Sequence, residues 1–552
     1  MEKTVQAAIM GECPVTVSKA TTLAELSKPY ENRFKNPVVL AQVNNDIQEL
    51  YKTLQDDSQV EFLDITNPHA FRAYQRSLAF LMIYAAKTVL GKGTRVIIGH
   101  SMNRNYYCEI EGCEEEIPEV LPKIEKVMKE TTEKELDIEK VNISIEEANA
   151  ISKEFSLNDK IEFLNYRRVS QVNFYKLDWF YDYFYGPMVP STKHLGVFKL
   201  SPMSNGFVLQ FPSRQDSSVL NPLKPLEKIS QIYAESRKWS RILRVSNVGE
   251  LNTIISSGGF GEIIRVSEAL HEKKIGIIAD MIREGGKKII LIAGPSSSGK
   301  TTFANRLSIQ LRVNGLKPHI ISLDNYFFGR ELVPYDEFGQ PDYESFDYMN
   351  REQLNCDLQK LLKGEKVDMP TFDFFNGRVE YKGDFLQLAE DDVLILEGIH
   401  GLNEKLTYSV AREEKFKVFI SALTQLNIDD HNRISTTDSR LIRRMVRDKN
   451  FRGMPATRTI GMWPSVSRGE DKHIFPYQEE ADVMFNSSLV YELCVLKHHA
   501  EPLLFGIGKD SEQYTEARRL IKFLDSFFGM SSESIPNNSI LREFIGGSCF
   551  KV

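Results

Sequence analysis

A glycine- and serine-rich stretch near the middle of the chain carries the residue types of a phosphate-binding loop. The residues from Ile289 to Leu307 read IILIAGPSSSGKTTFANRL, so an apolar run of strand type precedes the loop and a helical pattern follows it. Small residues let successive backbone N–H groups point at phosphate oxygens, and a helix beginning near Lys300 adds the positive end of its dipole. The Lys300 ammonium would reach the β and γ phosphates, and the Thr301 hydroxyl would hold Mg²⁺. The spacing GxxxxGK followed by Ser or Thr predicts a P-loop, against the alternative of an ordinary glycine-rich turn.

Two carboxylates end the strands that we expect to flank this loop. The run HIISLD ends in Asp324, and the run DVLILE ends in Glu397. Because the carboxyl ends of parallel strands face the ligand crevice, both side chains would point toward the phosphates. Asp324 would accept the proton of an attacking hydroxyl, and Glu397 would tie Mg²⁺ through water. The structural alternatives are a turn cap at Asp324 and a solvent-facing charge at Glu397.

A run of arginines follows later in the chain, in the segment RLIRRMVRDKNFRG. Helical spacing places four of them, Arg440, Arg443, Arg444 and Arg447, on one side of a helix. Guanidinium groups there would neutralise the charge that spreads over a transferring phosphoryl group, although a solvated basic face is the alternative. The residues that we expect to contact the nucleotide in the loop are Gly294, Pro295, Ser296, Ser297, Ser298, Gly299, Lys300, Thr301 and Thr302.

The composition of the whole chain argues against several classes of protein. The 552 residues contain 69 Lys and Arg against 76 Asp and Glu, a formal net charge of −7, which disfavours non-specific binding of nucleic acid as the main task. Six cysteines without CxxC pairs suggest neither a zinc ribbon nor a disulfide framework. No segment reaches the length of a membrane span, and the N-terminus lacks a sustained apolar core. We therefore expect a soluble cytoplasmic protein that does not bind membranes.

The elements that must position the chemical residues alternate between apolar strands and helices from Ile289 to about Ser488. This alternation predicts a parallel sheet with helices on both faces, built from IILIAG, HIISLD, DVLILEG, FKVFIS and ADVMFN. Short strands around one helix fill the first sixty or so residues, and longer amphipathic helices begin at Asn67. The predicted domains are residues 1–64, residues 65–235, a helical linker at 236–284, residues 285–500 and a C-terminal extension at 501–552, to which we assign no chemistry.

The motifs of the fourth predicted domain resemble those of the uridine kinase and phosphoribulokinase family. The runs GPSSSGKTT, SLDNYFF, SFDYMN, MPTFDFF, LILEGIH, RRMVRDKNFRG and ADVMFNSS match in order and spacing, nearer to the uridine kinases. The resemblance implies transfer of the γ-phosphoryl group of ATP to the 5′-hydroxyl of a nucleoside, with ATP and Mg²⁺ required. It implies that Asp324 is the base and that Lys300 acts on the phosphates. Arg444, Arg447 and Arg452 would be lid arginines, the last of them at the nucleotide.

The same resemblance assigns residues to the acceptor site. Asp347 would bind a ribose hydroxyl and Phe372 would lie beside the nucleobase, whereas a helix cap and core packing are the structural alternatives. Uridine kinases usually read YDFxxHxR at the base pocket, but this chain reads FDFFNGR. Asn376 and Gly377 stand where the pyrimidine-contacting histidine is expected. A site without these polar groups should discriminate bases poorly or prefer another base, so the sequence does not name the nucleoside.

The N-terminal third, which contains two predicted domains, resembles parts of another enzyme family. Residues 1–64 are similar to a TGS domain, a β-grasp module. Residues 65–235 resemble the editing domain of threonyl-tRNA synthetases, on RSLAFLMIYAAK, IEKVMKE and DYFYGPMVPST. That editing site needs three histidines and a cysteine. This chain has Arg76, Phe80, Phe184 and Met188 at those positions, none of which is a hydrolytic base near neutral pH, so we infer that hydrolysis is lost. His100 lacks partners for catalysis, and we expect it to be packed.

The predicted fold is therefore α/β, with a P-loop kinase domain built on a five-stranded parallel sheet. A TGS-like β-grasp domain and an α+β domain similar to the synthetase editing domain precede it. The first functional hypothesis is a nucleoside kinase that forms a homo-oligomer. The second is a regulatory P-loop NTPase whose nucleotide state controls RNA or tRNA binding by the N-terminal domains. An active aminoacyl-tRNA editing enzyme is a third, disfavoured by the four replaced residues.

Overall fold

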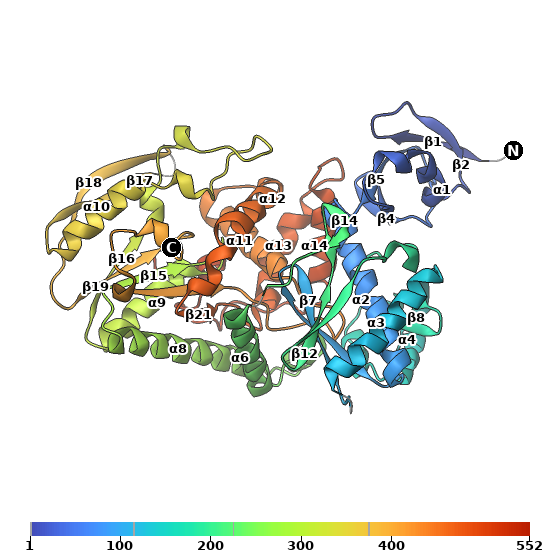
Figure 1. Ribbon diagram of the computed structural model, residues 1–552, viewed down its shortest axis with the longest axis horizontal. Helices are drawn as coiled ribbons and strands as arrows, with labels where there is room; N and C mark the ends of the chain where they lie inside the picture. The colour runs from blue at the N-terminus through green and yellow to red at the C-terminus, as the bar shows by residue number, and fades with distance from the viewer. Residues whose placement is uncertain (1–2, 114–115, 225, 374–375, 552) are drawn as a thin grey trace.

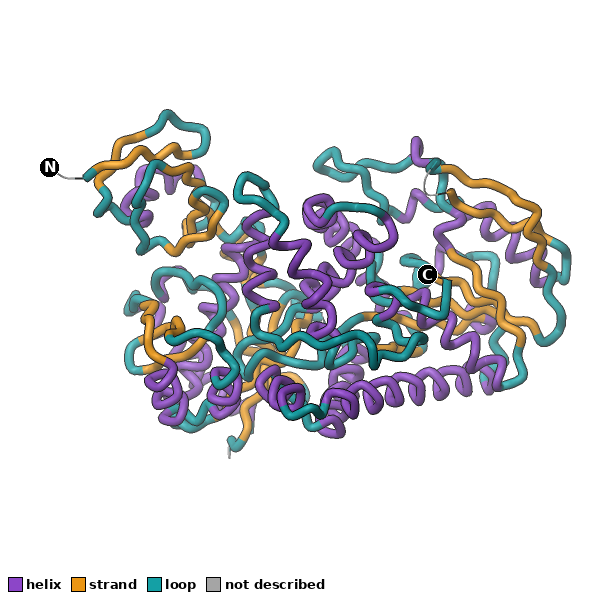
Figure 2. The backbone as a smooth tube through the Cα atoms, turned by 180° about the vertical axis from the view of Figure 1, so that it is seen from behind, coloured by secondary structure: helices purple, strands orange, loops and turns teal. Residues whose placement is uncertain are grey.

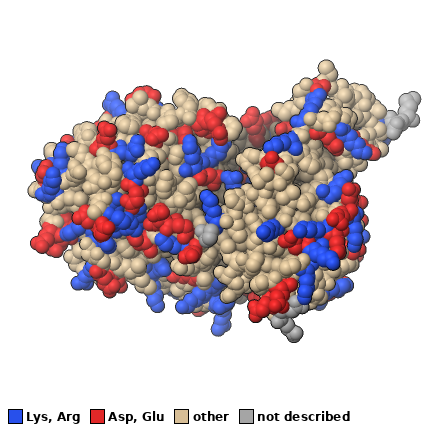
Figure 3. Space-filling model, viewed as in Figure 1, with Lys and Arg blue, Asp and Glu red and all other residues tan. Residues whose placement is uncertain are grey.

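The computed structural model describes residues 3–113, 116–224, 226–373 and 376–551. Figure 1 shows an elongated arrangement, with the small N-terminal sheet at one end and the large parallel sheet toward the other. Helices of the C-terminal half lie between them. No helix in these described ranges is both long and apolar enough to cross a membrane. Acidic and basic side chains are intermixed across the face drawn in Figure 3.

The first module is a five-stranded sheet with one short helix, as the sequence predicts. The strand order is β2-β1-β5-β3-β4, and β1 pairs with β5 in parallel while the other pairs are antiparallel. Thr22 begins the helix with a capping box, because its side chain accepts from the Glu25 backbone while Glu25 bonds back to it. The elements are β1 (Thr4–Ile9), β2 (Val15–Ser18), α1 (Leu23–Ser27), β3 (Val38–Val43), β4 (Asp46–Glu49) and β5 (Ser58–Asp64).

The second module packs helices against two larger antiparallel sheets and also contains a short two-stranded antiparallel pair. Its longest helix, α2, is capped by the Asn67 side chain, starts with a proline and ends at Gly91, whose φ is +102°. The sheets have the orders β11-β12-β7-β6 and β10-β9-β8. The elements are α2 (Pro68–Leu90), β6 (Arg95–Met102), β7 (Asn105–Glu111), α3 (Ile117–Glu133), β8 (Glu139–Ser144), α4 (Ile145–Glu154), α5 (Asn158–Leu164), β9 (Gln171–Leu177), β10 (Phe180–Tyr183), β11 (Lys199–Met203), β12 (Gly206–Gln210), β13 (Pro212–Ser213) and β14 (Asp216–Leu220).

Three helices, α6 (Glu227–Leu243), α7 (Val248–Ser256) and α8 (Phe260–Glu284), connect this module to the parallel sheet. Helix α8 runs along one long edge of the molecule in both Figure 1 and Figure 2. It packs against α9, where Glu272 accepts from the buried Arg306 at 2.7 Å. The segment predicted as a helical linker is therefore packed against the kinase core.

All five strands that the sequence predicts for the kinase domain form one parallel sheet, in the order β16-β19-β15-β20-β21. The side chains of β15 are all completely buried, which explains its unbroken apolar sequence. The strands are β15 (Ile289–Ala293), β16 (Lys317–Ser322), β19 (Asp392–Glu397), β20 (Lys415–Ser421) and β21 (Val483–Asn486). The surrounding elements are α9 (Lys300–Val313), α10 (Arg351–Leu362), α11 (Thr436–Arg452), α12 (Ala456–His473), α13 (Glu492–Phe505), α14 (Tyr514–Leu524), α15 (Arg542–Ile545) and the hairpin β17 (Val367–Asp373) with β18 (Arg378–Leu386).

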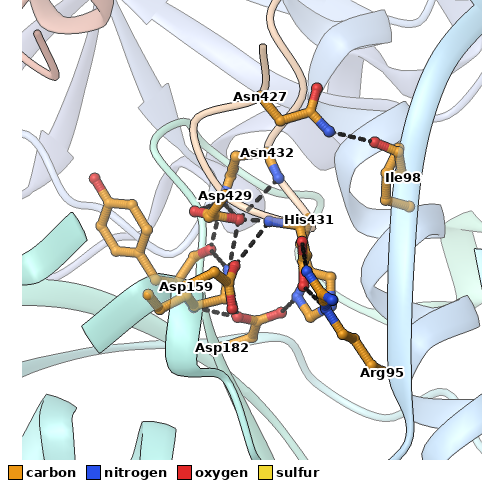
Figure 4. A network of polar contacts seen from close by, with 11 residues as sticks. Arg95, Ile98, Asp159, Asp182, Asn427, Asp429, His431 and Asn432 are labelled. Atoms are coloured by element: carbon orange, nitrogen blue, oxygen red, sulfur yellow. Dashed lines mark hydrogen bonds and ion pairs between the residues drawn. The ribbon is translucent and has the colours of Figure 1, made fainter. Parts of the chain in front are cut away.

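A buried polar network joins the second module to the loop between β20 and α11 (Figure 4). Lys160 of α5 lies 2.9 Å from both Asp182 and Asp429, and all three side chains are fully buried. His431 Nδ1 lies 2.7 Å from the second oxygen of Asp182. Burial opposes the charge on Lys160, but Asp182 and Asp429 hold its pKa above its usual value. At the edge of the network, the Ile98 N–H donates to the backbone carbonyl oxygen of Asp430 in this loop at 2.7 Å.

Candidate active site

The P-loop lies between the end of β15 and the start of α9, at the carboxyl edge of the sheet. Gly299 caps α9 with φ +87°, a backbone conformation that favours glycine. A Cβ at Gly294 would overlap a backbone carbonyl oxygen of β20. The Lys300 Nζ donates to the carbonyl oxygens of Gly294 and Pro295 at 3.0 and 3.2 Å. The lysine therefore folds back across the mouth of the loop, where the sequence predicts that phosphates bind.

The outer side of the loop is held by side chains from α11 and the end of β21. Three consecutive carbonyl oxygens each accept a bond: Ser296 from Arg440 Nε at 3.0 Å, Ser297 from Arg443 Nη1 at 3.3 Å and Ser298 from Ser487 Oγ at 2.5 Å. Arg440 and Arg443 are buried and paired with Glu470 and Glu492. These bonds fix the loop before any ligand arrives, which is the preorganisation that an anion site needs. Two of the four arginines that the sequence predicts on one side of this helix thus support the loop instead of facing a transferring phosphoryl group.

Three carboxylates share the space in front of Lys300. Burial raises the pKa of Glu397 to about 7, the neighbouring Asp324 acts in the same direction, and Lys300 opposes them. Burial also raises the pKa of Asp324, against the attraction of Lys300, Arg452 and Arg447. Burial and then Glu470 raise the pKa of Glu344 to about 7. The predicted base and the predicted metal residue are thus brought together, and their like charges create a site that favours a cation.

The donor set fits Mg²⁺ when the nucleotide completes it. Glu397 is 8% exposed, and Thr301 is the second residue of α9. In the described ranges no cluster of three or more His, Cys, Asp or Glu side chains is arranged to hold a metal ion by itself. Mg²⁺ binds oxygen ligands and usually takes one or two carboxylates together with substrate phosphates. Thr301 and Glu397 would therefore hold the ion jointly with a bound nucleotide.

The three predicted lid arginines gather around one buried acid near the end of α11. Asp448 is fully buried and lies 3.4 Å from Arg444, 3.0 Å from Arg447 and 3.5 Å from Arg452. Arg444 also donates to the Ser296 hydroxyl at 3.1 Å, which places its guanidinium beside the P-loop. Burial, together with Arg447, lowers the pKa of Arg452 to about 10. The lid arginines are therefore positioned by one carboxylate and kept within reach of the phosphate site.

The C-terminal extension, for which the sequence predicts no chemistry, completes the other side of the site. Glu543 accepts from the backbone N–H and the hydroxyl of Thr302 at 3.2 and 2.8 Å. Ile540 packs against Gly299, where an added Cβ would meet its side chain. Glu344, Glu470 and Glu543 are site residues that the sequence motifs do not reveal. Of the three, only Glu344 could have been suspected from the sequence, because it lies three residues before Asp347, a predicted site residue.

Comparison with known proteins identifies the family of the P-loop domain. The family model described as phosphoribulokinase / uridine kinase matches residues 289–492. The uridine kinase of Ureaplasma parvum is 30% identical over 205 residues, covering 35% of this chain and 86% of that enzyme. The chain belongs to the phosphoribulokinase/uridine kinase family. A solved structure described as a possible uridine kinase from Bacillus stearothermophilus is 18% identical, covers 39% of this chain and 98% of its own, and has a TM-score of 0.27.

A further relative matches outside this kinase family. The threonine–tRNA ligase of Syntrophotalea carbinolica is 26% identical over 192 residues, which is 34% of this chain. The chain spans only 30% of the length of that ligase. The similarity supports the architecture of a TGS-like and an editing-like domain in front of a family kinase domain.

The residues predicted for the acceptor site lie in different surroundings. Phe372 is 7% exposed, belongs to the core around β17 and meets Phe327 edge-on at 6.4 Å. Asn376 is exposed, and its amide donates to Asp373 at 2.5 Å. Asp347 is 80% exposed and lies 3.7 Å from Arg351. These contacts do not test the predicted acceptor roles of the three side chains, which stay predictions. The two phenylalanines at 374–375 lie outside the described residues.

The four positions of the predicted lost editing site do come together. Phe80 is completely buried, and its ring meets that of Phe184 edge-on at 5.7 Å. Met188 is buried, with its N–H bonded to Glu49 at 3.2 Å. Arg76 donates to the carbonyl of Pro187. The site where the ligase resemblance places histidines and a cysteine is thus filled by aromatic packing and one arginine.

His100, the surviving histidine of that domain, is packed as predicted. Its ring stacks on Tyr233 of α6 with centroids 3.5 Å apart and on Tyr107 at 5.0 Å. It is 7% exposed, and burial lowers its pKa well below the usual value. His100 is therefore a neutral stacking residue between the editing-like domain and α6.

Proposed function

We propose that this protein is an ATP- and Mg²⁺-dependent kinase that phosphorylates the 5′-hydroxyl of a nucleoside. The observation that carries the proposal is the convergence of Lys300, Asp324 and Glu397 at the mouth of a preorganised P-loop. The motif order, the family membership and the 86% coverage of a uridine kinase support the phosphotransfer chemistry. The nucleoside as acceptor rests on the resemblance to uridine kinases.

Each residue has a role that follows from its position. The P-loop amides and Lys300 bind the β and γ phosphates and align them with the acceptor. Asp324 orients the acceptor hydroxyl and takes its proton; its raised pKa makes it a stronger base than an exposed aspartate. Arg444 and Arg447 neutralise charge on the phosphoryl group as it moves. Mg²⁺, when bound, would supply further neutralisation of the phosphate oxygens.

The test is a screen of acceptors with the full chain. Incubation with ATP, Mg²⁺ and each of a panel of ribonucleosides and deoxyribonucleosides should yield a nucleoside monophosphate and ADP in equal amounts, measured by chromatography. Equal amounts exclude background hydrolysis. ADP and free phosphate formed at the same rate without any nucleoside would contradict the kinase proposal and support the NTPase alternative.

RNA contact is a second candidate, favoured by the similarity of the N-terminal domains to part of a threonine–tRNA ligase. We propose that any such contact runs through these domains. Filter binding of labelled tRNA at two salt concentrations tests this idea. Affinity unchanged by salt, or absent at low salt, would contradict it.

A further inference from the structure

A cavity of about 220 Å³ lies between the editing-like domain and the loop that leads into α11. Its walls come from α2, from β7, from the segment after β10 and from the first turn of α11. Arg76 and Phe184, two of the positions of the lost editing site, are among them. A water molecule takes about 30 Å³ of liquid volume, so this space fits a small organic molecule of several heavy atoms. Two positions of the predicted lost editing site thus line a space that is shared with the kinase domain.

Two arginines give the cavity an excess of positive charge. In the parts of the chain that the structure describes, neither Arg76 nor Arg433 has a carboxylate partner. The Arg76 guanidinium lies 5.6 Å from the ring of Tyr185, and that of Arg433 lies 5.2 Å from the ring of Tyr106. The Arg433 Nε is buried without a hydrogen-bond partner. Because a guanidinium without a counter-charge attracts anions and pairs well with carboxylate or phosphate groups, both arginines favour an anion in the cavity.

The acids near the cavity are already engaged. Asp438, which lines it, is held by two bonds of 2.7 Å from Arg519. Glu516 is shared between Arg519, at 2.6 Å, and Arg72, at 3.0 Å. Because these acids are already paired, they do not neutralise Arg76 and Arg433, which can still donate hydrogen bonds to an anion. The N-terminus of the 17-residue helix α11 also faces the cavity, and its dipole favours negative charge.

Asn432, in the wall of the cavity, has an acceptor left unpaired in the described part of the chain, which favours a hydrogen-bond donor on the ligand. Asn432 is 2% exposed, and its amide nitrogen donates to Asp429 and to the carbonyl of Tyr183, at 2.7 and 2.9 Å. Its Oδ1 is buried and has no partner within the described residues. A ligand that carries a hydroxyl or amino group next to its anionic group would satisfy both this oxygen and the arginines.

The cavity is mechanically connected to the phosphate site through α11. The helix begins at the cavity wall and, further along, supplies Arg440, Arg443 and Arg444 to the P-loop. The loop before it is tied to the editing-like domain by the Lys160 network shown in Figure 4. A ligand that draws Arg433 or the first turn of α11 toward itself would therefore shift the helix that holds the P-loop.

We propose that this cavity is a regulatory site for a small organic anion, with a carboxylate or phosphate group beside a hydroxyl or amino donor. Its occupancy changes the affinity of the P-loop for nucleotide. By linkage, nucleotide then changes the affinity of the anion by the same factor. The binding step does not depend on the proposed kinase reaction, whereas the coupling requires a P-loop that binds nucleotide.

Binding is tested on the full chain by calorimetry with glycerol 3-phosphate, L-lactate and propionate. A saturating non-hydrolysable ATP analogue with Mg²⁺ keeps these probes out of the P-loop, and Lys300→Ala protein serves the same purpose if no nucleotide binds. We expect glycerol 3-phosphate or lactate to bind, and propionate, which lacks the hydroxyl, to bind at least tenfold more weakly. Glycerol 3-phosphate alone identifies a phosphate ester as the ligand class, and lactate alone identifies a hydroxy acid.

The variants Arg76→Gln and Arg433→Gln should each weaken probe binding at least tenfold, whereas Arg265→Gln, an exposed arginine on α8, should leave it unchanged. Arg433→Lys keeps the charge and guards against misfolding of the neutral variant. The bound probe should also protect Arg433 from phenylglyoxal, read by mass spectrometry, and should change nucleotide affinity at least threefold. Equal binding by wild type and both glutamine variants, no binding of any probe, or unchanged nucleotide affinity would overturn the proposal.

Discussion

The P-loop site and the predicted lost editing site each bring together side chains from several segments, but the kinds of side chain differ. At the P-loop, the ionisable side chains Lys300, Asp324 and Glu397 are retained close together although burial raises the pKa of both acids. At the editing position, Phe80 and Phe184 pack ring against ring. Keeping buried ionisable groups is costly for a fold, so their presence at one site and their absence at the other support the proposal that the chemistry is performed at the P-loop.

The largest effect should come from removing the proposed base. Asp324→Asn keeps the size and polarity of the side chain but cannot take a proton, so phosphoryl transfer should fall by about 10²–10⁴-fold. Affinity for an ATP analogue should change less than about threefold. Steady-state turnover and equilibrium binding are the measurements, and Asp391→Asn, at an exposed position of the same domain, is the matched control. Unchanged turnover in Asp324→Asn would remove this residue from the mechanism.

The second prediction asks whether the two regions unfold as one unit. Lys160→Met leaves Asp182 and Asp429 buried without their cation and should destabilise the protein by about 3–5 kcal/mol. Thermal unfolding followed by calorimetry should show a single transition at lower temperature. The control, Lys176→Met, breaks an exposed pair with Glu139 and should cost no more than about 1 kcal/mol. Equal shifts in both variants would mean that the interface does not carry this stability.

The third prediction concerns Glu397, the proposed Mg²⁺ ligand. The pKa of Glu397 is about 7 in the fold, above the usual 4.5, so the folded state binds an extra proton between these values. Stability of the ligand-free protein should therefore fall as pH rises through this window, and the cost is complete above pH 7. Glu397→Gln should stabilise the ligand-free protein by about 1–3 kcal/mol at pH 8 and by much less at pH 4.

Melting temperatures at the two pH values measure this difference, with Glu133→Gln, an exposed position, as the control. In the wild type, Mg²⁺ affinity in the presence of nucleotide should weaken as pH falls below 7, because the ion must displace the proton. A stabilisation of equal size at both pH values would show that Glu397 is ionised normally.

The smallest expected effect belongs to the editing-like region. The full chain should release amino acid from aminoacyl-tRNA no faster than the uncatalysed rate, since Arg76, Phe80, Phe184 and Met188 offer no general base. Release of labelled amino acid from charged or mischarged tRNA is the measurement. Deacylation above background would contradict the inferred loss of hydrolysis, even if substitutions at these four positions left it unchanged.

Much of the fold could be predicted because its signals are local. The five kinase strands are short apolar runs between helical patterns, and they pair in one parallel sheet as expected. The glycine at 299 and the lysine at 300 mark a loop whose conformation follows from neighbours within a few residues. The packing of His100 could be predicted because its sequence neighbours offer no catalytic partner, and its ring stacks between two tyrosines.

The partners that hold the site could not be predicted, because they come from distant segments. Glu470 lies 174 residues beyond the Ser296 N–H that it accepts from. Arg440 and Arg443 share one helix face with Arg444, and helical spacing alone does not say which of them turn toward backbone carbonyls. The domain boundaries likewise stay predictions. Helix α8, in the predicted linker, packs against α9 and is therefore not a free connection.

The bond between Glu543 and Thr302 has a consequence for biosynthesis. The two residues are 241 positions apart, so the carboxylate leaves the ribosome long after the helix that it caps. During translation the N-terminal modules and the first strands of the kinase sheet are exposed before the phosphate loop has its final neighbour. The phosphate loop should therefore reach its final conformation only after residues 540–543 have been synthesised.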